Sequence, residues 1–147
     1  MKLKSLALGA ALSCLCLSPA FAQEEPQAVR QDQMKAIGRS MGALGGITKG
    51  EKPYDAAVVQ AALEAISTNA KAFPDQFPAG TETGLETEAA PAIWENKDDF
   101  RAKSDKLAAE ADTLLAAMPA DQAGVGAAMK VLGATCGDCH ESYRLKR

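Results

Sequence analysis

Four segments of this chain carry apolar residues at alternating spacings of three and four, and stretches containing glycine and proline separate them. These segments are residues 34–44, 59–73, 100–118 and 125–143. Such spacing is typical of amphipathic helices that bury one face. Residues 74–91 show no period and contain several prolines and glycines, so we expect a long loop there. The pattern predicts an all-α fold, an antiparallel up-down four-helix bundle.

Local signals indicate where these helices begin and end. Asp55 is expected to cap the second helix, Asp98 or Asp99 the third, and Asp121 marks the start of the fourth. The pair Gly45-Gly46 is expected to end the first helix. Connections other than the long loop are short, which favours antiparallel neighbours.

The composition agrees with one helical domain. The chain has 147 residues, of which 47% are hydrophobic and 24% charged, so a single core can form. Aromatic residues make up only 5%, which favours helices over strands. The formal net charge of −3 offers no basic face to neutralise phosphates, and we expect no nucleic-acid partner.

Residues 1–22 have the pattern of a secretory signal peptide. A lysine-containing start precedes an apolar run over 6–17, and small residues lead up to an expected cleavage after Ala22. The run is too short to span a membrane, so the mature domain, residues 23–147, is expected to be exported without membrane insertion. A lipoprotein interpretation at Cys14 stays open, although its apolar run would be very short.

The sequence Cys136-Gly137-Asp138-Cys139-His140 places two cysteines on the apolar stripe of the fourth segment. His140 is the only histidine, and the remaining cysteines, Cys14 and Cys16, belong to the expected signal peptide. Two cysteines at this spacing serve a redox dithiol, part of a zinc site, or the covalent attachment of a c-type haem.

Haem attachment explains this motif better than the other two interpretations. Structural zinc needs four ligands, whereas the mature chain offers three adjacent ones. A reactive dithiol normally follows a strand at a helix N-terminus, and a disulfide between i and i+3 of a helix has poor geometry. Thioether bonds from Cys136 and Cys139 would instead fix the porphyrin, and His140 would reach its iron. We therefore predict one covalently bound haem c per chain.

A haem motif near the C-terminal end of a four-helix pattern resembles the class II cytochromes c, and specifically the cytochrome c prime family. Further stretches of the mature chain resemble that family in the same order, namely 30–35, 49–56, 77–81 and 92–94. The resemblance implies a periplasmic haem protein with His140 as the proximal ligand. It also implies a five-coordinate, high-spin iron that binds nitric oxide and carbon monoxide.

The family also implies an antiparallel homodimer. The first helix, with or without the second, would supply the contact, and Gly38, Gly42 and Gly45 would allow the two copies to approach closely. Alternatively, these glycines only relieve crowding near the porphyrin.

The resemblance assigns further residues to the surroundings of the haem. Arg30 and Gln31 would lie near the propionates, although Arg30 could also be an ordinary solvated charge. The loop residues Thr81 and Glu82 would lie close to the haem edge. Phe77 would line the distal pocket.

Two further residues, Arg144 and Met34, are open to more than one interpretation. Arg144 would flank the proximal ligand, or merely belong to a basic chain end. Met34 would face the iron, either as an apolar lid or, as in the cytochromes c-556, as a sixth ligand in an electron carrier with a periplasmic redox partner. It could also simply belong to the apolar stripe. The surrounding segments favour the lid, and therefore gas binding with protection against nitric oxide. An enzyme is not expected, because no acid–base pair accompanies the motif.

Overall fold

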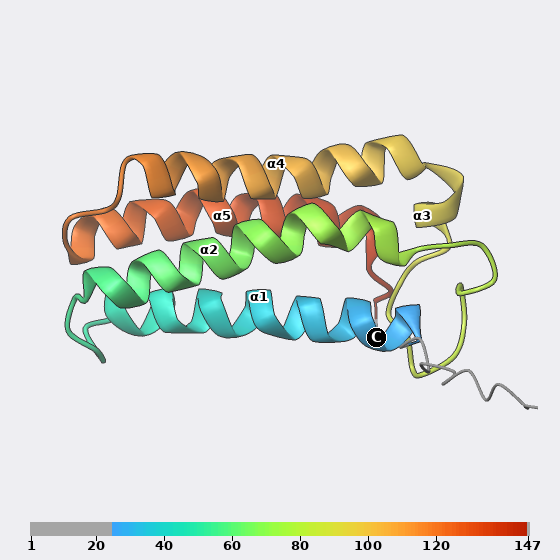
Figure 1. The fold of residues 1–147 in the computed structure, drawn as a ribbon, viewed down its shortest axis with the longest axis horizontal. Coiled ribbons are helices and arrows are strands. Elements are labelled where there is room, and N and C mark those ends of the chain that lie inside the picture. Colours follow the sequence, from blue (N-terminus) through green and yellow to red (C-terminus); the bar gives the residue numbers. More distant parts are fainter. Residues whose placement is uncertain (1–24, 147) are drawn as a thin grey trace, which may run out of the picture.

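A computed structural model describes residues 25–146, and these residues form the predicted bundle (Figure 1). Its elements are α1 (Pro26–Thr48), α2 (Ala56–Ala72), the 3₁₀ turn η1 (Phe73–Gln76), α3 (Ala92–Glu95), α4 (Lys97–Ala116) and α5 (Gln122–Tyr143). The four long helices run side by side, with α3 at the end where α1 begins (Figure 1). The prediction of an all-α four-helix bundle is confirmed. The expected signal peptide, its cleavage site and Cys14 lie outside the described residues.

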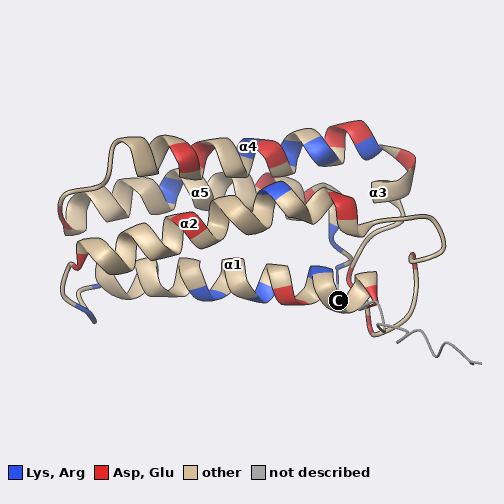
Figure 2. Ribbon diagram, in the orientation of Figure 1, with Lys and Arg blue, Asp and Glu red and all other residues tan. Residues whose placement is uncertain are grey.

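No helix within residues 25–146 has the length and apolar character needed to cross a bilayer. Charged residues of both signs are concentrated in the first turns of α4 (Figure 2).

Two of the predicted helix caps are present. Asp55 accepts hydrogen bonds from the backbone N–H groups of Ala57 and Val58, and Asp121 accepts one from Gly124. The predicted cap of the third helix is wrong, because α4 already begins at Lys97 and its N-cap is Asn96. Asp98 and Asp99 lie in the first turn instead, where a carboxylate interacts favourably with the helix dipole.

The expected end of the first helix is also wrong, since α1 continues through Gly45 and Gly46 to Thr48. Leu44 and Ile47 on either side of the pair are fully buried in the core. Burying two such side chains outweighs the propensity cost of two glycines, about 1 kcal/mol each. Beyond the helix, Gly50 adopts a positive φ of 73° and turns the chain toward α2.

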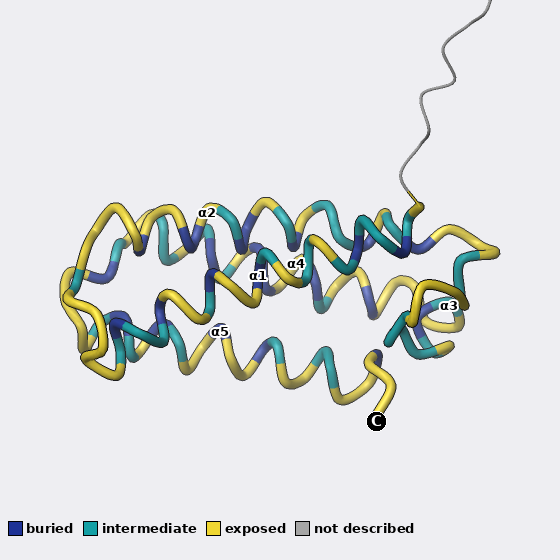
Figure 3. Tube along the Cα trace, turned by 90° about the horizontal axis from the view of Figure 1, so that it is seen from below, coloured by how far each residue is buried: buried dark blue, intermediate teal, exposed yellow. Residues whose placement is uncertain are grey.

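The buried side chains form two separate clusters. The main cluster fills the length of the bundle and contains apolar residues from all four long helices. The second lies around α3 and consists of Phe77, Ile93, Phe100 and Tyr143. Exposed residues occur along the whole of α5, between its buried positions (Figure 3).

Candidate haem site

Met34 and His140 lie at the same level of the bundle, on helices that run in opposite directions. Two close approaches fix the register of α1 against α5. A Cβ at Gly45 would lie 3.8 Å from Met129 Cε, and one at Gly126 would lie 3.5 Å from Thr48 Cγ2. Because both helices rise by the same amount per residue, the antiparallel register extrapolates from these pairs to Met34 opposite His140.

The haem motif occupies an incompletely covered part of the α5 stripe. Val125 and Leu132 are fully buried, whereas Cys136, Cys139 and His140 are only half-buried. Met34 on α1 is likewise half-buried. The two helices therefore present incompletely covered side chains at the same level, and this arrangement fits a flat prosthetic group inserted between them.

The two cysteines face different clusters. Cys136 packs against the main cluster, as Met34 does, and Cys139 packs against the second cluster. No disulfide joins the two sulfur atoms. Burial is the main cause that raises the pKa of Cys139 to about 11, and it also raises the pKa of Cys136. Both pKa values shift in the direction opposite to that of the nucleophile in a redox dithiol.

The imidazole of His140 is prepared to act as a neutral ligand. Burial, followed by the positive charge of Arg144, lowers the pKa of His140. A neutral ring is the form that coordinates a metal. Within residues 25–146, no group of three or more His, Cys, Asp or Glu side chains gathers as it would around a zinc ion.

Arg30 is a buried cation, 3% exposed, so the interpretation as a solvated charge is wrong. Its guanidinium donates to Thr81 O at 2.7 Å and Thr87 Oγ1 at 2.8 Å, with longer contacts to Thr81 Oγ1 and Gln76 O. It also lies 4.8 Å from the ring centre of Phe77. No carboxylate among the described residues forms an ion pair with it, and its Nε is buried without an acceptor. Burial lowers the pKa of Arg30, and Glu82 opposes this effect.

This unpaired donor is the observation that best matches a haem propionate. A buried guanidinium is costly unless an anion or several acceptors compensate it. Carbonyl and hydroxyl oxygens satisfy most of its N–H groups, and one remains free to receive a carboxylate. The residues present therefore fit a haem with its acidic edge near Arg30.

The other residues expected at the haem edge gather around Arg30. Gln31 Nε2 donates to Leu85 O at 2.6 Å. Thr81 Oγ1 donates to Pro78 O at 2.8 Å, and Glu82 accepts from the backbone N–H of Gly80. The structure thus brings the start of α1 and the loop after η1 together.

Phe77 lies within the aromatic part of the second cluster. Its ring contacts Phe73, Phe100 and Trp94 edge-on, at centroid distances of 5.0, 4.7 and 5.6 Å. Tyr143 extends the group through Phe100 at 5.2 Å. Trp94 and Tyr143 therefore pack in this cluster, and Phe77 belongs to the same cluster, against which Cys139 packs.

Arg144 does not merely end the chain as a solvated base. Its Nε and Nη2 atoms both contact Glu88 Oε2, at 2.7 and 2.6 Å. Sequence reasoning missed Glu88, because the two residues are 56 positions apart and the loop has no periodic pattern.

Sequence reasoning also missed three side-chain contacts between α4 and α5. Thr135 Oγ1 donates to Glu110 at 2.7 Å, Lys103 pairs with Asp138 at 2.5 Å, and the Tyr143 hydroxyl donates to Asp99 at 2.6 Å. These pairs flank Cys136, Cys139 and His140 in turn, so they fix the rotation of α5 about its axis. The spacing of Asp99, Lys103 and Glu110 on one helical face was the available signal.

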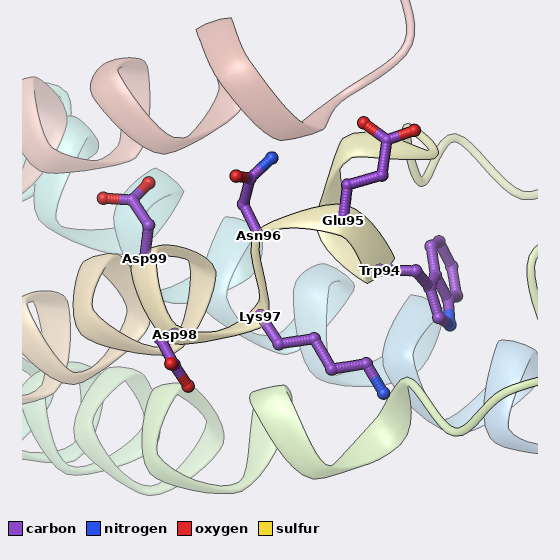
Figure 4. A pocket seen from close by; sticks show the side chains of 6 residues that line it. All are labelled: Trp94, Glu95, Asn96, Lys97, Asp98 and Asp99. Carbon is purple, nitrogen blue, oxygen red and sulfur yellow. The ribbon is translucent and has the colours of Figure 1, made fainter.

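A surface hollow of about 540 Å³ lies at the junction of α3 and α4, lined by residues 94–99 (Figure 4). Its lining residues are consecutive in sequence, and Asp98 and Asp99 point to opposite sides (Figure 4). None of the motif residues lines it. We attribute this hollow to the bend of the chain and assign it no ligand.

Comparison with known proteins agrees with this site. The Cytochrome C′ family model matches residues 25–144. Cytochrome c-556 of Agrobacterium fabrum is 59% identical over 147 residues, covering 100% of this chain and 99% of that protein. Among solved structures, cytochrome c′ from Rhodopseudomonas palustris has a TM-score of 0.80 at 35% identity, covering 85% of this chain and 99% of its own. The structure of cytochrome c556 from R. palustris has a TM-score of 0.76 at 35% identity, and it covers the same shares of the two chains. The chain therefore belongs to the cytochrome c′ family of class II c-type cytochromes and carries covalently bound haem c.

Proposed function

We propose that this protein is an electron carrier whose haem iron is held between His140 and the thioether of Met34. The register of α1 against α5 puts Met34 level with His140, as both ligation and an apolar lid require, and the names of the relatives are what favours ligation. The relative with 59% identity is named cytochrome c-556, and three further relatives with 56–66% identity have the same name. Histidine and methionine together are the usual axial pair of electron-transferring c-type haems.

In this proposal each part of the site has a separate task. Cys136 and Cys139 hold the porphyrin by thioether bonds, and His140 supplies the proximal imidazole. Haem c, once bound, supplies a site that gains and loses a single electron. Arg30 compensates the propionate charge from within the bundle, and Phe77 keeps water away from the side on which Cys139 packs.

Gas binding is the second candidate, and the sequence alone favoured it. Its specific support is the family itself, because a 31% identical structure is a nitric oxide complex of a cytochrome c prime variant from Alcaligenes xylosoxidans. In this alternative, Met34 is an apolar lid over an open coordination position, and nitric oxide or carbon monoxide is the ligand.

Two further parts of the proposal concern location and assembly. Residues 1–22 act as a signal peptide cleaved after Ala22, so that residues 23–147 function in the periplasm. Two copies associate through α1, where added Cβ atoms at Gly38 and Gly42 would meet nothing within 4 Å. These exposed positions leave room for a second helix.

Optical and EPR spectra of the ferric holoprotein test the proposal. We expect low-spin signals in the wild type that become high-spin in Met34→Ala. Met41→Ala is the matched control, because Met41 is also half-buried on α1 and lies two turns further along. High-spin signals in the wild type, unaffected by Met34→Ala, would instead support the gas-binding alternative.

A further inference from the structure

Residues 81–90, which we call the strap, are fastened to the first turns of α1. Three side chains of α1 hydrogen-bond to the strap, namely Gln27, Arg30 and Gln31. The shorter bonds, between 2.6 and 2.9 Å, end on the carbonyl oxygens of Thr81, Thr83 and Leu85 and on the hydroxyl of Thr87. Among the described residues, all hydrogen bonds from these side chains end in residues 76–87.

The other end of the strap is fastened to the chain that leaves α5. Glu88 receives two contacts from the guanidinium of Arg144, at 2.7 and 2.6 Å. The backbone N–H of Leu145 donates to Glu88 O at 2.8 Å, and that of Ala90 donates to Tyr143 O at 3.0 Å. These bonds form a short antiparallel bridge, so the strap joins the beginning of α1 to the end of α5.

Between its two fastenings the strap has an unfavourable backbone. Gly84, Leu85 and Glu86 have consecutive positive φ angles of 96°, 47° and 51°. Residues other than glycine rarely adopt this conformation. It persists only where the surrounding structure holds it, and it is concentrated at functional segments. The contacts on both sides of residues 84–86 provide such a hold.

We propose that the strap sets the separation of Met34 from His140, and that Glu88 is a positioning residue for the Met34 thioether. Met34 lies one helical turn after Arg30, and His140 lies one turn before Arg144. Each axial side chain therefore neighbours one fastening of the strap. Met34 and Cys136 both pack against the main cluster, so the strap adds to the direct packing of α1 against α5 at this end of the bundle. This inference rests on the proposed function.

The experiment compares Glu88→Ala with Glu141→Ala in the holoprotein. Glu141 is an exposed carboxylate beside His140, so its removal changes the charge equally while leaving the strap intact. Two quantities are measured: hydrogen exchange of the α1 amides over residues 28–34, and the apparent affinity of the ferrous protein for carbon monoxide, which must displace Met34.

For Glu88→Ala we expect faster exchange in residues 28–34 and a rise of about three- to fivefold in carbon monoxide affinity. Glu141→Ala should change neither quantity. The double variant Glu88→Arg, Arg144→Glu exchanges the two charges. It should return the hydrogen-exchange rates and the carbon monoxide affinity toward the wild-type values. A rescue of this kind would not follow from a general loss of stability.

If Glu88→Ala matches the control in both measurements, the strap proposal is overturned, although Met34 ligation can still stand. Failure of the proposed function looks different. In that case Met34→Ala leaves the ferric spectrum unchanged, and the role of Glu88 toward Met34 falls with it. Hydrogen exchange in α1 then still reports whether the strap holds the helix.

Discussion

Replacing Arg30 with methionine should strongly destabilise the protein, because the guanidinium links α1 to the loop after η1. The substitution keeps an unbranched apolar stem and removes the charge. It removes the donor from Thr81 O, bonded at 2.7 Å, and the shorter of two donors to Thr87 Oγ1, which keeps the Ala89 N–H at 3.2 Å. Losing each of these hydrogen bonds to a charged donor costs about 1–2 kcal/mol. Loss of the contact with the Phe77 ring adds about 1 kcal/mol.

These costs exceed the gain from no longer burying a charge that has no carboxylate partner among the described residues. We expect a net loss of about 3 kcal/mol in the free energy of unfolding. For a domain of this size, that corresponds to a fall of about 10 °C in Tm. The assay is urea unfolding of the holoprotein, followed by far-ultraviolet circular dichroism and by haem absorbance.

Arg39→Met provides the matched control, because Arg39 is an exposed arginine on the same helix. The free energy of unfolding of Arg30→Lys should lie between those of Arg30→Met and Arg39→Met, since lysine keeps the charge but loses the planar set of donors. If Arg30→Met lies within about 0.5 kcal/mol of Arg39→Met, Arg30 does not anchor the loop and the reasoning is refuted.

Four other predictions follow from individual contacts. Thr135→Val should lower the free energy of unfolding in urea by about 1–2 kcal/mol, because Glu110, only 20% exposed, loses the Thr135 hydroxyl as a donor. An unchanged free energy of unfolding would show that water replaces this hydroxyl. Asp55→Ala should cost about 1 kcal/mol by removing the α2 cap, whereas Asp55→Asn should cost much less. The hydrogen bond to Asp99, and then burial, raise the pKa of Tyr143 to about 12. In Asp99→Asn this pKa should fall toward 10, as measured by the absorbance of the phenolate. The folded state holds this proton more tightly than the unfolded state does. Tyr143 should therefore contribute its full share to the free energy of unfolding below about pH 10 and lose that share between about pH 10 and 12. Tyr143→Phe should not show this loss.

The parts of the structure that depend on local sequence were predictable. Asp55 and Asp121 cap their helices through backbone groups two or three residues away, so a short window contains the whole interaction. The haem motif is equally local, because Cys136, Cys139 and His140 are almost adjacent. The pair Gly45-Gly46 misled the prediction, since packing of Leu44 and Ile47 in the core decides where α1 ends.

The parts that depend on distant partners were not predictable from the chain alone. Arg30 could be assigned to the site by resemblance, but its bonds to Thr81 and Thr87 cross more than fifty residues of sequence. The pairing of Glu88 with Arg144 is similarly remote. Neither pair follows a helical or strand period, so only the folded arrangement reveals that one loop joins both ends of the site.

The most direct test of the central claim is the proton NMR spectrum of the ferrous holoprotein labelled with ¹³C at the methionine methyl groups. The methyl signals of Met34, Met41, Met118 and Met129 can be assigned with single substitutions. A methyl group bound to the iron lies against the porphyrin ring, whose ring current moves its signal far upfield. We predict one such signal, absent from Met34→Ala and present in Met41→Ala. If all the methyl signals lie in the ordinary range, Met34 is not a ligand and the electron-carrier proposal is contradicted.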